Sequence, residues 1–184
     1  MSITAVKSYF KELGLEDRIL EFSVSSATVA LAAQAVGCEE ARIAKTLSFL
    51  VDGHAVLIVT AGDAKIDNRK FKDQFHTKAK MLTAEELAAL VGHAPGGVCP
   101  FAVPDTVEVW LDESLRRFPT VFPAAGSDNS AIELSCGELE RFSRARLGGS
   151  LQELAARRTV IPLCDGIFYA VPLTLGAKQD TLLW

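Results

Sequence analysis

The fold is decided by the stretch of residues 43–60, which reads IAKTLSFLVDGHAVLIVT. The Asp52-Gly53 pair in its middle is a strong signal for a two-residue hairpin turn. The apolar and β-branched residues on either side predict two antiparallel strands, residues 43–51 and 55–60. We therefore expect a β-hairpin here, and it is the clearest pair of strands in the chain.

Short helices and strands are interleaved around this hairpin. Helical spacing and capping residues predict helices at residues 3–13, 27–36 (capped by Ser25 or Ser26), 66–75, 84–91 and 136–142. Alternation predicts strands at residues 18–23, 78–82, 107–111, 121–124 and 131–135, the last two joined by the polar turn 125–130. The hairpin and the short connections argue against strict parallel winding. The expected fold class is therefore mixed α/β, a single domain with a central mixed, largely antiparallel sheet flanked by helices.

Composition narrows the class of protein. The chain has 184 residues, 49% of them hydrophobic and 23% charged, which is typical of one globular domain and excludes a disordered chain. The net charge of −4 excludes a wholly basic protein that coats nucleic acid. No apolar run approaches the roughly 18 residues that a membrane helix needs, and we find no signal peptide. The four cysteines form no C-x-x-C pair, so we expect a reduced, cytoplasmic protein without structural zinc.

Lys45 is the most informative residue of the first strand. Strand alternation places it on a face whose other members are large and apolar: Ile43, Leu47, Phe49 and Val51. A buried ammonium there costs several kcal/mol unless it has a partner or lines a cavity. One interpretation is a functional site. The other is a lysine near the start of the strand whose amine reaches out to water.

Two loops are further candidates. Residues 96–101 read GGVCPF, and free backbone N–H groups in such a loop can bind a carbonyl oxygen or an oxyanion. Residues 125–130 read AGSDNS and could line a pocket. For both loops the alternative is an ordinary turn between two elements. Cys99 is expected to be a buried structural thiol rather than a nucleophile.

A basic stretch follows the hairpin. Residues 65–80 contain six lysines and arginines against two aspartates, in a chain whose net charge is negative. Such a patch either attracts phosphates or is simply the solvated face of a helix. Nucleotide-binding and hydrolase motifs are missing, because the sequence has no G-x-G-x-x-G, no G-x-x-x-x-G-K-[ST] and no G-x-S-x-G.

Three segments in order, IAKTLSF (43–49), GGVCPF (96–101) and GSDNSAIEL (126–134), resemble the YbaK family of aminoacyl-tRNA deacylases. This family is related to the editing domain of bacterial prolyl-tRNA synthetases, and the resemblance covers about residues 3–143. It implies the same mixed fold, as a sheet or partial barrel. Two departures are Cys99, where relatives often have serine, and the last part of the chain, for which the family offers no counterpart.

The resemblance also implies an activity: hydrolysis of the ester that joins a wrong amino acid to the 3′ end of tRNA. The family's essential lysine corresponds to Lys45. Thr46 follows it, where alanine-removing members tend to carry asparagine, which favours Cys-tRNA(Pro) as the substrate. No nucleophilic side chain is needed, because either water or the substrate's own thiol attacks the ester.

The remaining site residues follow from the same motifs. We expect the Gly97 amide to take part in catalysis as an oxyanion donor beside Lys45. The expected substrate-binding residues are Thr46, Gly96, Val98, Pro100, Phe101, Gly126 and Ser127. The residues expected to face the acceptor stem of the tRNA are Lys65, Arg69, Lys70 and Lys72.

These expectations define the organisation and partners of the protein. Residues 1–146 are expected to form the deacylase domain and residues 147–184 a C-terminal extension of unknown role, with a helix at 151–158 and a hairpin at 160–173. The expected partners are mischarged tRNA and prolyl-tRNA synthetase, with no cofactor, no metal and no membrane. The alternatives are a non-catalytic module that binds the tRNA end or a synthetase, and a hydrolase of small free esters.

Overall fold

The hairpin is the longest feature of the structure, a computed structural model that describes residues 3–145. Strand β2 (Ile43–Val51) pairs antiparallel with β3 (His54–Ala61), and Lys45 lies opposite Thr60. Asp52 and Gly53 both have positive φ, 48° and 83°, which matches the right-handed twist of the two strands. The predicted hairpin is confirmed. The helix and hairpin predicted beyond residue 150 lie outside the described residues.

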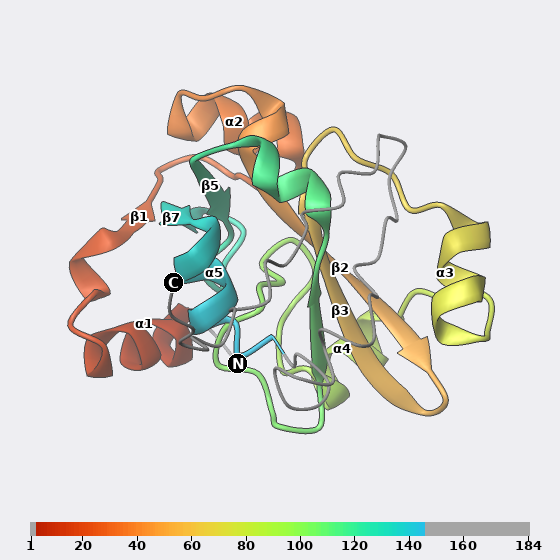
Figure 1. Ribbon diagram of the computed structural model, residues 1–184. Coiled ribbons are helices and arrows are strands. Elements are labelled where there is room, and N and C mark those ends of the chain that lie inside the picture. The colour runs from red at the N-terminus through yellow and green to blue at the C-terminus, as the bar shows by residue number, and fades with distance from the viewer. Residues whose placement is uncertain (1–2, 146–184) are drawn as a thin grey trace, which may run out of the picture.

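The hairpin is the centre of a curled, five-stranded sheet with the order β4-β3-β2-β5-β7 (Figure 1). The other strands of this sheet are β4 (Glu108–Leu111), β5 (Thr120–Pro123) and β7 (Leu134–Ser135). The β2–β3 and β5–β7 pairs are antiparallel, whereas β2–β5 and β3–β4 are parallel. A separate antiparallel pair joins β1 (Ile19–Glu21) to β6 (Ser130–Ile132). The expected mixed α/β class, with the sheet curled into a half-barrel, is confirmed.

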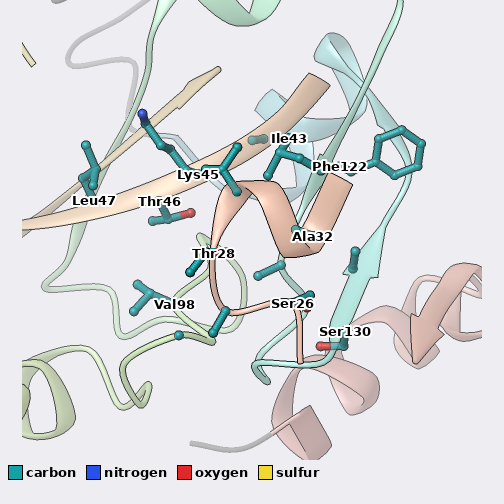
Figure 2. Close-up of a pocket in the computed structure, with 16 residues that line it drawn as sticks. Ser26, Thr28, Ala32, Ile43, Lys45, Thr46, Leu47, Val98, Phe122 and Ser130 are labelled. Carbon is teal, nitrogen blue, oxygen red and sulfur yellow. The ribbon is translucent and has the colours of Figure 1, made fainter. Parts of the chain in front are cut away.

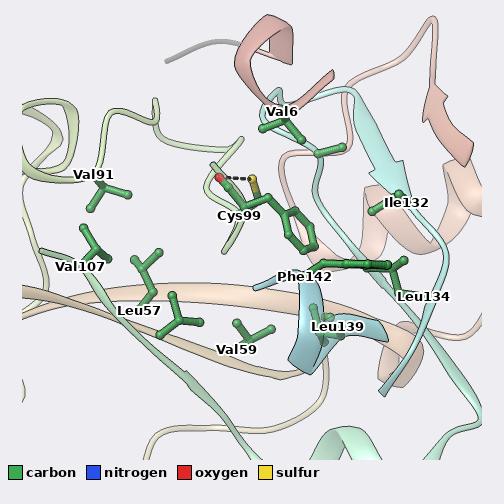
Figure 3. Close-up of a cluster of buried hydrophobic side chains, with 14 of the residues drawn as sticks. Val6, Leu57, Val59, Val91, Cys99, Val107, Ile132, Leu134, Leu139 and Phe142 are labelled. Atoms are coloured by element: carbon green, nitrogen blue, oxygen red, sulfur yellow. Dashed lines mark hydrogen bonds between the residues drawn. The ribbon is translucent and has the colours of Figure 1, made fainter. Parts of the chain in front are cut away.

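Helices cover both faces of the sheet. The main core lies between one face and helices α1 (Ile3–Glu12), α4 (Ala84–Leu90) and α5 (Cys136–Phe142). Figure 3 shows part of this core, with Leu57 and Val59 of β3 near Leu139 and Phe142 of α5. On the other face, α3 (Asn68–Phe75) buries Phe71 and Phe75 against Phe49 of β2. Helix α2 (Val29–Val36) covers Ile43 at the start of β2.

The face of β2 that carries Lys45 is therefore not the face of the main core. Ala44 packs into the main core, whereas Ile43 and Phe49 pack against separate helices on the opposite side. Lys45 lies between these two apolar contacts, in the interval between α2 and α3 along the strand. Its neighbours are apolar, as the alternation predicts, and the interval leaves room for a long polar side chain.

Several predicted elements differ from the structure. The strand expected at residues 78–82 is reduced to a single bridge between Met81 and Phe49, and α3 begins at Asn68 rather than at residue 66 because Asp67 caps it. Helix α2 begins two residues later than expected, because its cap is Thr28 and because Ser26 instead donates to the Asp128 carbonyl. The single strand expected at residues 131–135 is split at Glu133, since β6 pairs with β1 and β7 pairs with β5. The Ser26 hydrogen bond and the β1–β6 pairing bring residues 19–26 against residues 128–132.

Candidate active site

A cavity of about 320 Å³ opens where α2, the first half of β2 and two loops meet (Figure 2). Four separate stretches of the chain supply its walls. The lining residues are Ser26, Ala27, Thr28, Val29, Ala32, Ile43, Ala44, Lys45, Thr46, Leu47, Gly96, Val98, Phe122, Ala124, Ser130 and Ala131. Most of these side chains are small or apolar, and the polar groups are few, which is typical of a site that binds a small organic group.

Lys45 lies on the wall of this cavity, and its ammonium is anchored. The Nζ atom donates to the carbonyl oxygen of Gly62, at 2.9 Å, and to the carbonyl oxygen of Ala64. Both acceptors belong to the loop that follows β3. The amine therefore does not simply reach out to water. It is a positive charge held at a fixed place beside the cavity.

Thr46 contributes a buried hydroxyl that has no hydrogen-bond partner among the described residues. Its Oγ1 atom is buried, and within residues 3–145 no group forms a hydrogen bond with it. A buried hydroxyl left without a partner costs about 1–3 kcal/mol. A ligand in the cavity could supply that partner, because Thr46 lines the cavity together with Lys45; the two side chains leave β2 on opposite sides of the strand (Figure 2).

The glycine loop reaches the cavity through Gly96 and Val98 rather than through Gly97. The Gly97 N–H donates to the Ala94 carbonyl at 3.2 Å, which closes a turn. A Cβ atom at Gly97 would lie 2.8 Å from the Cα atom of Ser127, so this position needs glycine for close packing. Among the described residues, nothing accepts a hydrogen bond from the Val98 N–H, so this donor is not already in use, unlike that of Gly97.

The other predicted site residues support the wall from behind. Pro100 and Phe101 are buried, and the Phe101 ring meets the ring of Phe10 edge-on at 4.9 Å. Gly126 has a φ of 94° and packs against α1. The Ser127 hydroxyl donates to the Ser130 hydroxyl at 2.7 Å, and Ser130 is the residue of this turn that lines the cavity.

The predicted tRNA-binding residues lie apart from the cavity. Lys65, Arg69 and Lys72 are exposed and Lys70 is partly buried, because α3 turns its Phe71 face toward the sheet. None of the four lines the cavity. Lys65 is the nearest in sequence to the Lys45 anchor, since it follows Ala64.

Cys99 is a buried thiol. Its side chain is fully buried, and the Sγ atom lies 3.6 Å from Nε2 of His93. Burial raises the pKa of the Cys99 thiol to about 12, so the thiolate is not formed at neutral pH. Burial also lowers the pKa of His93. The pair belongs to the core and not to the cavity wall.

Several cavity residues were not predicted. Ser26, Thr28 and Ala32 read in the sequence as a cap and a buried helix, and Phe122 and Ala131 read as strand core. Lining positions of this kind look like ordinary core positions until the fold brings them together. Within residues 3–145, no cluster of three or more histidines, cysteines or acidic residues is placed to hold a metal ion. None of the described helices is long and apolar enough to cross a membrane.

Known proteins share this architecture. A family model for the aminoacyl-tRNA editing domain matches residues 24–142. YwhH of Bacillus subtilis (strain 168), an uncharacterized protein, is 50% identical over 148 residues, which are 80% of this chain and 94% of YwhH. Proline--tRNA ligase of Leuconostoc citreum (strain KM20) is 32% identical over 88 residues, which are 47% of this chain and only 15% of the ligase.

A solved structure points the same way. The structure of a candidate trans-editing enzyme for prolyl-tRNA synthetase has 29% sequence identity and a TM-score of 0.71, and the match covers 78% of this chain and 92% of that one. The family expected from the three motifs is therefore confirmed. The chain belongs to the aminoacyl-tRNA editing domain family.

Proposed function

We propose that this protein is a trans-editing deacylase: it hydrolyses the ester of a mischarged tRNA, with Cys-tRNA(Pro) or a related misacylated tRNA as the substrate. One observation carries the proposal. Lys45, Thr46 and the Gly96–Val98 loop come from distant parts of the chain and converge on one open cavity. An open cavity favours a deacylase over the non-catalytic binding module.

Ester hydrolysis is accelerated by groups that stabilise the negative charge of the transition state. Attack on the ester carbonyl places that charge on its oxygen, and donors that are already oriented stabilise it without reorganisation. In the proposed mechanism the Val98 N–H takes the role that the sequence assigned to Gly97, and the Lys45 ammonium supplies the positive charge. Thr46 holds the substrate through its unpaired hydroxyl. The nucleophile is a bound water or the thiol of a cysteinyl substrate.

The rest of the cavity suits the amino acid. Alanine methyl groups from α2 and from the 124–131 segment form much of the wall opposite Lys45. In our proposal this part receives the amino-acid side chain, while the ester lies near Lys45 and Val98. Lys65, Arg69, Lys70 and Lys72 then bind phosphates of the acceptor stem.

The proposal extends to the organisation and partners of the chain. Residues 1–146 form the deacylase domain, and residues 147–184 are an extension to which we assign no role. Prolyl-tRNA synthetase is a proposed partner, since its own sequence contains a related segment. No metal or other cofactor takes part, and the protein works in the cytoplasm.

The test is a panel of purified aminoacyl-tRNAs mixed with the enzyme, with loss of the aminoacyl group followed over time. We expect hydrolysis of Cys-tRNA(Pro) or a close relative and its loss in Lys45→Ala. Lys11→Ala, which removes an exposed lysine of α1, is the matched control and should keep full activity. Undiminished hydrolysis by Lys45→Ala, or no hydrolysis of any substrate by the wild-type protein, would overturn the proposal.

A further inference from the structure

We infer that Asp63 and Arg117 are positioning residues for Lys45: their ion pair fixes the loop whose carbonyl groups hold the lysine ammonium. The catalytic meaning of this inference rests on the function proposed above. The loop consists of Gly62, Asp63 and Ala64, directly after β3. Its first and last carbonyls accept from Lys45 Nζ, so the residue between them controls where both acceptors point.

The Asp63 carboxylate forms a bidentate ion pair with Arg117. Arg117, the last residue of the 3₁₀ helix η3 (Glu113–Arg117), donates from Nη1 to one carboxylate oxygen at 3.0 Å and from Nη2 to the other. The Nε atom of Arg117 donates to the Ser114 carbonyl at 2.9 Å, which steadies the guanidinium against its own helix. Paired contacts of this geometry orient both partners more strictly than a single ion pair does.

The loop is also held at its start. The Ala61 N–H donates to the Ser114 hydroxyl at 3.1 Å, so η3 grips the loop at two points. On the opposite side there is no free space. A Cβ atom on Gly62 would lie 2.0 Å from the Glu40 carbonyl oxygen and 2.7 Å from a methyl carbon of Val29. The loop therefore packs between η3 on one side and Val29 and Glu40 on the other. This packing restricts the positions of the Gly62 and Ala64 carbonyl groups.

The charge of Asp63 adds to this arrangement. The hydrogen bonds from Arg117 lower the pKa of Asp63, and the positive charges of Arg117 and Lys45 lower it further. The carboxylate is therefore ionised at neutral pH, and the positive charges of both Arg117 and Lys45 stabilise its ionised form. Loss of this carboxylate would release Arg117 and would also remove the negative charge next to the lysine anchor.

The test measures Lys45 directly and then measures catalysis. Asp63→Asn keeps the size of the side chain and removes its charge, and Arg117→Gln breaks the same pair from the other end. Lys45 reactivity is read by competitive labelling with acetic anhydride and mass spectrometry. We expect faster labelling of Lys45 in both variants, kcat for tRNA deacylation lower by about tenfold, and little change in KM, because a misplaced charge affects the reacting ester most.

Glu21→Gln is the matched control. Glu21 forms an ion pair with Lys7 at 2.6 Å, and its side chain is 49% exposed, close to the 47% of Asp63. This variant should leave Lys45 labelling and kcat unchanged. The double variant Asp63→Asn/Arg117→Gln should be no worse than either single variant, since both act on one contact.

The outcomes separate the inference from the proposed function. Unchanged Lys45 labelling in Asp63→Asn overturns the inference, and so does unchanged kcat in an active protein whose Lys45 labels faster. A wild-type protein without deacylase activity overturns the proposed function instead, and the labelling experiment still decides whether Asp63 and Arg117 position Lys45.

Discussion

Two threonines on neighbouring strands of the hairpin show how the same side chain is used differently. Thr60 is fully buried in β3, and its hydroxyl donates to the Ala61 carbonyl at 3.2 Å. Thr46 of β2 has a buried hydroxyl without a partner among the described residues, and it faces the cavity. A buried hydroxyl without a partner does not stabilise the fold, and because Thr46 lines the cavity we interpret it as a group that a ligand can engage.

Thr46→Val should separate these roles. Valine has the same shape but no hydroxyl, so the free energy of unfolding should stay the same or rise by about 1 kcal/mol. Deacylation of the tRNA substrate should fall, because the substrate loses a hydrogen-bond partner. Thr60→Val is the control: it should lower the free energy of unfolding by about 1 kcal/mol. Urea unfolding measures stability, and a loss of stability in Thr46→Val would contradict the argument.

At the scale of elements, the loop around Gly97 determines the shape of the cavity wall. Its neighbours Gly96 and Val98 line the cavity, while Gly97 packs directly on the Ser127 backbone. Gly97→Ala places a methyl group 2.8 Å from Ser127 Cα, which must displace one of the two loops. Crowding of this kind costs about 1–3 kcal/mol.

We therefore expect Gly97→Ala to lower both the free energy of unfolding and the deacylation rate. Gly137→Ala is the matched substitution on α5, where a new methyl group would meet nothing within 4 Å. This control should stabilise the protein by up to about 1 kcal/mol, because alanine is the better helix former. Calorimetry on both variants gives the comparison, and equal melting temperatures would contradict the packing argument.

The start of α5 gives a prediction for acid. Arg18 donates to Glu138 at 2.6 Å, and the Ser135 N–H donates to the same carboxylate at 2.9 Å. The Arg18 hydrogen bond, followed by the one from Ser135, lowers the pKa of Glu138 to about 2, whereas the unfolded chain has about 4.3. The stabilising contribution is therefore complete above about pH 4.3 and is lost as the pH falls toward 2.

Glu138→Gln tests this prediction. Because the ion pair is partly exposed and screened by solvent, we expect a loss of only about 1 kcal/mol at pH 7. The difference between variant and wild type should shrink below pH 4.3 and vanish only below about pH 2. Unfolding curves across this range give the measurement, and a difference that does not change with pH would refute the assignment.

How well a feature can be predicted from the sequence depends on how close in sequence the residues are that determine it. The hairpin of β2 and β3 and the helices α4 and α5 are all set by residues close in sequence, and the sequence predicts them. The split between β6 and β7 was missed, because the choice of partner strand depends on residues more than 100 positions away.

The residues of the candidate site also fall into two groups, those that the sequence identifies and those that it does not. Lys45 is conspicuous because a charge in an apolar strand breaks the local pattern, and the paired glycines are conspicuous because they break regular structure. The remaining wall of the cavity does neither, since Ala32, Ile43 and Phe122 resemble core residues. The role expected of Gly97 passes to Val98 in our proposal because a backbone donor is identified only by its hydrogen bonds.

For the whole molecule, charge is unevenly distributed. The chain carries a net charge of −4, yet residues 65–80 are strongly basic, and their side chains Lys65, Arg69 and Lys72 are exposed. Nonspecific attraction of tRNA to an acidic protein is weak, so binding should depend on this local patch. Each phosphate contact contributes a dependence on salt, because counterions are released on binding.

We expect tRNA affinity to fall steeply as salt rises, and the double variant Arg69→Gln/Lys72→Gln to bind more weakly with a shallower salt dependence. The slope of log affinity against log salt should decrease by about 0.7–0.9 for each lost phosphate contact. Lys11→Gln on α1 is the control and should not change the slope. Fluorescence anisotropy with labelled tRNA measures it. A slope unaffected by the double variant would place the tRNA on another surface.

The cavity wall is assembled from residues 26–32, 43–47, 96–98 and 122–131, which are joined only by the folded architecture. Any molecule that fills it contacts all four stretches together, so its binding energy opposes separation of each stretch from the others. A tight, uncleavable mimic of the substrate would therefore hold the four stretches together. Amide hydrogen exchange should then slow at the same time in a helix, a strand and two loops that are far apart along the chain.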